Sequence, residues 1–204
     1  GSEMCIRDRV NALKKAGIPA GLYHGALDQQ QRQLALEMMT NGTTPVLVTT
    51  DLGARGLDIA GVKNVVHYHI PPTQDAWTHR NGRTGRMGAD GTVYVITSEH
   101  DSIPDYIAYD RSYVPDPSGC APWHPANATL YFNAGKKDKI SKGDIAGYLI
   151  QRGGLTAPEV GRISVSDRYA VAAVPATKVS EVLEAVRPHK LKNKRVLVSV
   201  VENA

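Results

Sequence analysis

The feature that most constrains the fold is an alternation of short apolar runs with segments of helical periodicity in the first half of the chain. The runs PVLVTT, VKNVVHYHI and GTVYVIT have the composition of buried strands. Helix-like segments lie before or between them, such as QQQRQLALEMMTNG after an expected N-cap at Asp28, and TQDAWTHRNGR. Strands and helices that alternate at this pace predict an α/β domain with a parallel sheet.

Changes in composition divide the 204 residues into four segments. Residues 1–9, GSEMCIRDR, show no apolar periodicity, and we set them aside as a tag or artefact. Residues 10–107 form the predicted α/β domain. Residues 108–126 contain four prolines and no period, which indicates a linker. Residues 127–202 follow the order strand, helix, strand, strand, helix, strand, and predict an α+β domain with a ferredoxin-like split β-α-β arrangement.

Charge is distributed unevenly between the two halves. Residues 1–126 contain 11 Lys and Arg against 13 Asp and Glu, whereas residues 127–204 contain 13 against 7. The second domain is therefore the one expected to face a polyanion, although surplus lysines also serve solubility. No apolar run approaches the length of about 18 residues that a membrane span needs, so we expect a cytoplasmic protein with no membrane partner. Cys5 and Cys120 are too few for a disulfide framework, and no metal site is expected.

The segment HRNGRTGRMG, residues 79–88, suggests phosphate binding. Arg80, Arg83 and Arg86 recur every third residue, and glycines between them leave the backbone open to a bulky anion. The sequence contains no phosphate-cradling G-x-x-x-x-G-K-[ST] segment. The simpler alternative is a basic helix face that pairs with acids.

Two further segments lie where a parallel sheet presents its functional edge. Gln29 and Arg32 stand at a helix start, which favours anions, although for these two residues alone a solvated helix face is the better explanation. The segment VTTDLGARGLDI offers hydroxyls and open backbone to a phosphate chain, and Asp58 could accept from a ribose hydroxyl. In the alternative interpretation, Asp51 and Asp58 only cap turns.

These segments together resemble the C-terminal motifs of the DEAD-box RNA helicases. VLVTTDLGARGLDI is followed some twenty residues later by HRNGRTGRMG and preceded by LDQQQR, and the resemblance covers roughly residues 10–105. It implies the second of two RecA-like domains, incomplete at its N-terminus. The family's usual last motif is HRIGRTGR, so Asn81 is a departure. That motif form is the one typical of RNA helicases, which disfavours a DNA helicase.

The resemblance implies roles for individual residues. Arg83 and Arg86 correspond to the arginine fingers that act on the γ-phosphate of ATP, and Asp58 and Gly56 fall in the nucleotide-binding part, with Asp58 at the ribose. Arg32, Thr49 and Gly56 fall where the family contacts the RNA backbone, and His79 falls where the two RecA-like domains are linked. ATP with Mg²⁺ would be bound mainly by an N-terminal RecA-like domain whose Walker A and DEAD motifs are absent here, so we do not expect this chain to hydrolyse ATP alone.

The segment ATLYFNAGKKDKISKGDIAGYL resembles the start of the RRM-like RNA-binding domain of DbpA-type helicases, a resemblance that covers about residues 127–202. The stacking signature of RRM domains is absent, because RYAVAAV offers only Tyr169. Lysines in two loops are expected to form a rim that grips phosphates, unless they are merely solvated: Lys136, Lys137, Lys139, Lys190, Lys192 and Lys194. The resemblance implies structured RNA as the partner, with ribosomal RNA as one candidate.

The leading hypothesis is therefore the C-terminal part of an ATP-dependent RNA helicase, consisting of a RecA-like domain and an RRM-like domain. The alternative is a non-catalytic RNA-binding protein that retains a RecA-like scaffold. The two γ-phosphate fingers favour the first hypothesis, because a simple RNA-binding protein does not need them.

Overall fold

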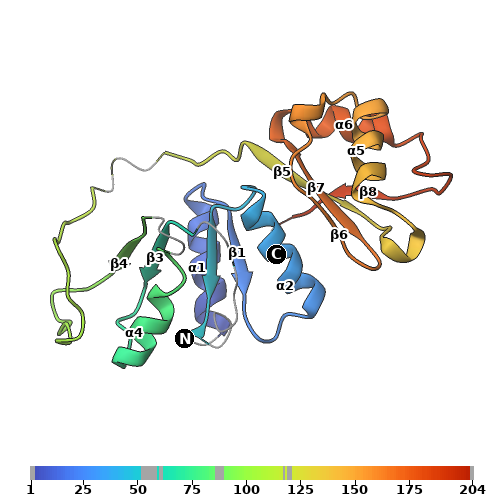
Figure 1. Cartoon of the computed structure of the whole chain (residues 1–204). Helices are drawn as coiled ribbons and strands as arrows, with labels where there is room; N and C mark the ends of the chain where they lie inside the picture. The colour runs from blue at the N-terminus through green and yellow to red at the C-terminus, as the bar shows by residue number, and fades with distance from the viewer. Residues whose placement is uncertain are drawn as a thin grey trace. The chain divides into compact units, whose positions relative to one another are not determined.

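A computed structural model describes residues 3–51, 59, 62–85, 90–116, 118 and 121–202. The chain divides into two compact units, residues 1–48 with 121–204 and residues 49–120, and each is described by itself. The N-terminal segment contains helix α1 (Glu3–Lys15), strand β1 (Ala20–Tyr23) and helix α2 (Gln29–Thr40), which are labelled in Figure 1, followed by strand β2 (Val46–Thr49).

Helix α1 begins at Glu3, seven residues before the predicted start of the domain at residue 10. Ile6 is buried and packs in one apolar cluster with Val10. The two residues are four apart, so they lie on the same helix face, and the buried face of α1 extends back to Ile6. The predicted exclusion of residues 3–9 from the fold is corrected accordingly. Their predicted origin as a tag or artefact stays a prediction.

Helix α2 has the ends that its sequence predicts. The Asp28 carboxylate accepts from the backbone N–H of Gln31 at 2.7 Å, and the Gln31 side chain accepts from the backbone N–H of Asp28 at 3.0 Å. This reciprocal capping box satisfies two backbone donors that the helix cannot pair internally. The helix ends before Gly42, whose φ of +72° is the left-handed conformation that glycine adopts without steric cost.

The second unit contains the parallel strand pair that the apolar alternation predicts. Strand β3 (Asn64–His67) pairs with strand β4 (Thr92–Val95) in parallel register, and helix α4 (Gln74–Asn81) connects them. Strands β1 and β2 form the other described pair of the α/β domain. Among the described residues between β4 and residue 127 there is no strand and no helix of more than one residue, and the predicted linker at 108–126 stays a prediction.

The C-terminal domain shows the predicted order of strands and helices. Its elements are β5 (Asn127–Phe132), the 3-10 helix η3 (Lys136–Asp138), α5 (Lys142–Gln151), η4 (Ala157–Glu159), β6 (Ile163–Val165), β7 (Ala170–Pro175), η5 (Ala176–Lys178), α6 (Val179–Val186) and β8 (Val198–Val200). The strands pair antiparallel in the order β6-β7-β5-β8. This is the ferredoxin-like arrangement of an RRM-like domain.

The core of this domain lies between the sheet and helices α5 and α6 (Figure 1). Leu130 and Phe132 of β5 are fully buried there with Ile145 and Leu149 of α5. Helix α5 is capped by Ser141, whose hydroxyl accepts from the backbone N–H of Asp144 at 3.2 Å. Leu130 and Phe132 are separated by two positions, as expected for residues on one face of a strand.

Candidate functional site

The predicted phosphate-binding segment begins in the last turn of α4 and continues past its end. The helix starts at Thr73, whose hydroxyl accepts from the backbone N–H of Ala76 at 3.2 Å. It ends at Asn81, with Gly82 as its C-cap. His79 and Arg80 therefore lie in the last helical turn, whereas Arg83 follows the cap and lies in the turn beyond it.

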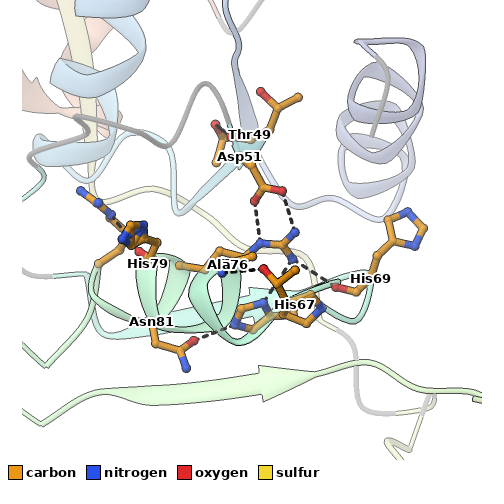
Figure 2. A network of polar contacts seen from close by, with 12 residues as sticks. Thr49, Asp51, His67, His69, Ala76, His79 and Asn81 are labelled. Carbon is orange, nitrogen blue, oxygen red and sulfur yellow. Dashed lines mark hydrogen bonds and ion pairs between the residues drawn. The ribbon is translucent and has the colours of Figure 1, made fainter. Parts of the chain in front are cut away.

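Arg80 forms an ion pair with Asp51. Its Nε and Nη2 donate to the two carboxylate oxygens of Asp51 at 2.6 and 2.8 Å, and its Nη1 donates to the carbonyl oxygen of His69 at 3.2 Å (Figure 2). This two-bond pairing of guanidinium and carboxylate is the strong form of an ion pair. For Arg80, pairing with an acid is what the simpler alternative for this segment predicted, but the sequence did not identify Asp51 as that acid. The pairing ties the segment after β2 to the helix that leads to Arg83.

His67 at the end of β3 is the second anchor of this helix. Its Nε2 lies 2.7 Å from the Asn81 Oδ1, its Nδ1 lies 3.4 Å from the Arg80 Nη1, and its ring lies 4.9 Å from that of Trp77. These partners assign the tautomer in which Nε2–H donates to Asn81 and Nδ1 accepts from Arg80. Asn81, where the chain departs from HRIGRTGR, therefore has a structural partner of its own.

The charge state of His67 follows from its surroundings. Burial lowers its pKa below the ordinary value, the hydrogen bond to Asn81 raises the pKa, the Arg80 guanidinium lowers it and the Asp51 carboxylate raises it. Burial is the largest of these effects, because His67 is only 2% exposed. The neutral imidazole is therefore the form that this network holds at neutral pH.

Arg83 occupies a turn that is fixed on both sides. Its Nε donates to the carbonyl oxygen of His79 at 3.4 Å. The next residue, Thr84, donates its hydroxyl to the carbonyl oxygen of Val62 at 2.5 Å. The backbone of Gly91 packs closely against the same turn and leaves no room for a side chain, since a Cβ atom there would lie 2.4 Å from the Thr84 Oγ1. Arg83 thus projects from a positioned turn, although its own side chain remains partly exposed.

The other residues predicted for the nucleotide site are only partly described. Gly56, Asp58 and Arg86 lie outside the described residues, and their predicted roles remain predictions. His79 is exposed, and its Nε2 lies 3.6 Å from the Asp75 Oδ1, one helical turn away. Its predicted position leaves it accessible for contact with another domain.

The residues predicted for the RNA backbone lie in different compact units. Thr49 is the last residue of β2, and its hydroxyl donates to the carbonyl oxygen of Thr50 at 3.1 Å. Arg32 lies in the first turns of α2 in the other unit, and its buried Nε has no hydrogen-bond partner among the residues that the structure describes. Arg32 therefore has donor capacity that a phosphate could satisfy.

The two lysine loops of the C-terminal domain meet. The Lys192 ammonium donates to the carbonyl oxygen of Lys139 at 2.9 Å and to the Asp144 carboxylate at 3.2 Å. The Lys194 ammonium pairs with the Asp138 carboxylate at 2.7 Å. The hydrogen bond from Lys194 holds the pKa of Asp138 below its usual range, as the Ser141 hydroxyl chiefly does for Asp144.

These ion pairs divide the predicted rim into two kinds of lysine. Lys192 and Lys194 join the loops and are partly neutralised by carboxylates. The remaining predicted lysines are exposed: Lys136, Lys137, Lys139 and Lys190. A depression of about 360 Å³ beside the loops is lined by residues that include Arg152, Lys190 and Lys192. Cations around such a depression suit a phosphate backbone.

Neither a metal cluster nor a membrane-spanning helix is present in the part of the chain that the structure describes. Its residues contain no group of three or more His, Cys, Asp or Glu side chains that could hold a metal ion. None of its helices is long and apolar enough to cross a membrane.

Comparison with known families gives one match for each domain. Residues 3–88 match the family described as "Helicase conserved C-terminal domain", and residues 129–200 match the family described as "DbpA RNA binding domain". The two matches follow the predicted order of domains and leave the proline-rich segment between them.

Several RNA helicases are similar to this chain. ATP-dependent RNA helicase DbpA of Escherichia coli is 30% identical over 94% of this chain and 44% of that protein, and its Bacillus subtilis counterpart is 26% identical over 95% and 47%. Human ATP-dependent RNA helicase DDX42 is 44% identical over 45% of this chain and 10% of its own length. The C-terminal domain of the DEAD-box protein Dbp5 is a similar solved structure, with 30% identity over 48% of this chain and 59% of that chain and a TM-score of 0.44. The chain spans less than half the length of these curated relatives.

Proposed function

The chain belongs to the DEAD-box RNA helicases, whose C-terminal part it matches, and we propose that it supplies the arginine-finger side of an ATPase site together with RNA-binding surfaces. The observation that carries the proposal is that the residues of HRNGRTGRMG have different positions and partners. Arg80 is held by Asp51, and Asn81 by His67, whereas Arg83 lies beyond the helix cap in a turn fixed by Thr84. Similarity to ATP-dependent RNA helicases favours this function over a non-catalytic RNA-binding protein.

The anchored turn explains how Arg83 would act. A guanidinium stabilises the negative charge that develops on a γ-phosphate during transfer, provided that it is already in position when the reaction occurs. The Arg80–Asp51 pair and the His67–Asn81 bond hold the end of α4, so Arg83 starts from a defined point. We assign Arg86 as the second finger, Asp58 as the ribose contact and Gly56 as the close backbone approach, from their places in the motifs.

ATP with Mg²⁺ fits this chain only in part. In the proposed enzyme, Mg²⁺ would neutralise phosphate charge, but no described cluster of acidic or histidine side chains here can hold the ion. We therefore assign the metal and most nucleotide contacts to an N-terminal RecA-like domain, with His79 facing that domain. This chain's own contribution is to donate hydrogen bonds to the γ-phosphate and to accept one from the ribose.

RNA is the proposed polyanionic partner, and structured RNA the proposed class. In the α/β domain, Arg32, Thr49 and Gly56 would hold the sugar-phosphate backbone. In the C-terminal domain, we propose that Lys136, Lys137, Lys139 and Lys190 contact phosphates directly, while Lys192 and Lys194 chiefly fix the loops. A ribosomal RNA and a cytoplasmic location are proposed on the basis of similarity to DbpA.

An ATPase assay tests the proposal. The chain alone should show no RNA-stimulated turnover, and turnover that is abolished by Arg83→Lys would refute the idea of half a site. Fused to the N-terminal domain of E. coli DbpA, the chain should hydrolyse ATP, and Arg83→Lys should reduce kcat by about 10³-fold or more. Arg111→Lys, in the linker, is the matched control and should leave kcat unchanged.

Binding of a hairpin RNA at increasing salt tests the lysine loops. Removing Lys136 and Lys137 should reduce the slope of log K against log salt by roughly 0.7–0.9 for each phosphate that is no longer neutralised. Removing Lys194 should have a smaller effect on the slope, because its ammonium already pairs with Asp138. Equal salt slopes for the unmodified chain and for the variants that lack Lys136, Lys137 or Lys194 would contradict the assignment of Lys136 and Lys137 as phosphate contacts.

A further inference from the structure

Strand β7 of the C-terminal domain is buried on both faces, although only one face meets helices α5 and α6. Ala170, Ala172 and Val174 point into that core. The intervening residues Val171 and Ala173 point to the opposite face, yet they are only 1% and 2% exposed. An antiparallel sheet that packs on one side commonly leaves its other face to water. The outer face of β7, in the middle of the sheet, is therefore covered.

The cover at one end of this outer face is the end of helix α2. Thr129 of β5, which is paired with Ala173, is fully buried, and its hydroxyl lies 2.8 Å from the Thr43 hydroxyl. The Asn41 amide donates to the Thr129 Oγ1 at 3.3 Å, and the Asn127 amide donates to the Asn41 carbonyl oxygen at 3.1 Å. All of these residues belong to one compact unit.

The contact continues along α2. The Gln30 amide donates to the Tyr131 hydroxyl at 3.3 Å, and the buried Glu37 carboxylate lies 3.5 Å from the Arg162 Nε. Gln30, Glu37 and Asn41 lie within about 40° of one another around the helix, since each residue advances it by about 100°. On the strand, the contacting residues Asn127, Thr129 and Tyr131 alternate, as residues on one face must.

The lengths of the two elements agree with a lengthwise contact. The eleven residue-to-residue steps from Gln30 to Asn41 span about 16 Å of helix, and the four steps from Asn127 to Tyr131 span about 13 Å of strand. We propose that the outer face of this sheet is a docking surface for helix α2 of the helicase domain, and that RNA bases do not stack there.

The aromatic residues of this face support the exclusion of bases. Tyr131 stacks on Tyr169 with ring centroids 5.5 Å apart and an angle of 20° between the rings. The Tyr131 hydroxyl also accepts from Gln30, so a face of its ring and its polar end are both in use. A base that used the occupied ring face or the hydroxyl of Tyr131 would have to displace Tyr169 or Gln30. Most of the contacts are polar, as is typical of interfaces between domains of one chain.

The docking leaves the proposed RNA contacts on other surfaces. Arg32 lies about 160° around α2 from Gln30, so it points away from the docked stripe. The lysine loops are joined to each other through Lys192 and the Lys139 carbonyl, not to α2. One helix can thus bear an RNA contact on one side and the RNA-binding domain on the other.

A disulfide trap tests the docking. In a chain carrying Cys5→Ser and Cys120→Ser, the pair Thr43→Cys and Thr129→Cys should form a bridge under mild oxidation, because sulfur atoms would replace hydroxyls that are already in contact. Thr40→Cys with Thr129→Cys is the matched control and should not form one, since Thr40 is exposed on a neighbouring side of α2. Failure of the first pair to bridge, or equal bridging by both pairs, would overturn the proposal.

NMR of the Tyr131 ring tests the exclusion of bases, with a single-stranded oligouridylate as the probe. The ring signals should not move in the unmodified or bridged chain, and should move in Thr43→Arg, which places a bulky cation in the interface. A shift in the unmodified chain that the bridge abolishes would show that the face is a base platform and would refute the proposal. Absence of hairpin binding would contradict only the proposed lysine loops, because the bridge is measured without RNA.

Discussion

Replacing Asp51 with Asn should loosen the turn that carries Arg83, because Asp51 holds Arg80 in the preceding helical turn. The Asp51 carboxylate receives two hydrogen bonds from Arg80, at 2.6 and 2.8 Å. Asparagine keeps the shape of the side chain and one acceptor oxygen, but it loses the charge and the second acceptor. The last turn of α4 then loses its link to the segment after β2.

The expected magnitude follows from the exposure of the two side chains. Arg80 is 22% exposed and Asp51 is 50% exposed. Exposed ion pairs contribute about 0.2–1 kcal/mol, and hydrogen bonds to charged groups about 1.5–3 kcal/mol. The half-screened pair should lie near the boundary of these ranges, at about 1 kcal/mol. That free energy corresponds to a roughly fivefold increase in local opening.

Amide hydrogen exchange measures this opening directly. The N–H groups of Gly82 and Arg83, which donate to Thr78 and Arg80 at 3.0 and 3.2 Å, should exchange about fivefold faster in Asp51→Asn. The N–H of Arg152, at the end of α5, is the internal control and should be unchanged. A double-mutant cycle with Arg80→Gln should give a coupling free energy of about 1 kcal/mol.

The pKa of His67 gives an independent check. Loss of the Asp51 charge should lower this pKa further, whereas loss of the Arg80 charge should raise it, because the two charges act in opposite directions. Additive effects on exchange in the double mutant, or movement of the His67 pKa in the same direction in both single variants, would refute the proposed anchor.

Three further predictions concern stability. Gly135→Ala should lower the free energy of unfolding in urea by about 1–3 kcal/mol, because the new Cβ would lie 2.3 Å from a backbone oxygen. Gly147→Ala, where the Cβ meets open space, should raise it by about 0.5–1 kcal/mol, and the reverse order would contradict the packing argument. Ser141→Ala should cost about 1 kcal/mol in the same assay, since α5 loses its N-cap, and an unchanged midpoint would show that the cap contributes nothing. Because the pKa of His67 is lowered in the folded chain, the unfolded chain binds the proton more readily. The stability that this histidine contributes should therefore be full above about pH 6.5 and decline below it. Thermal melts of His67→Gln at several pH values should lose that part of the pH dependence.

Local signals identified the elements that carry the site. The Asp28 capping box and the left-handed Gly42 act within a few residues, so the ends of α2 were predictable. The order of strands and helices in the C-terminal domain was predictable for the same reason, because strand and helix periodicity are short-range properties. The start of α1 was misjudged, since a single buried residue, Ile6, is too little to show a period.

The family resemblance singled out Arg83 and Arg86 but not the residues that hold the turn of Arg83, and Arg86 lies outside the described residues. The partner of Arg80 is Asp51, 29 positions away, and that of Asn81 is His67, 14 positions away. No local rule links residues at such separations, because these contacts exist only when α4 has packed against β3 and against the segment after β2. Asn81 itself was a visible departure from the family pattern, and that departure was the one available signal.

The sequence alone determined that this protein has an α/β domain with helicase motifs followed by a basic ferredoxin-like domain, because caps, periodicity and composition depend on neighbours in the chain. Only the tertiary structure decided what the charged and polar side chains do. Lys192 and Lys194 join loops, Thr129 lies buried on the outer face of a sheet, and Arg80 pairs with Asp51. A polar group takes its role from the nearest opposite charge or acceptor in space, which the order of residues does not specify.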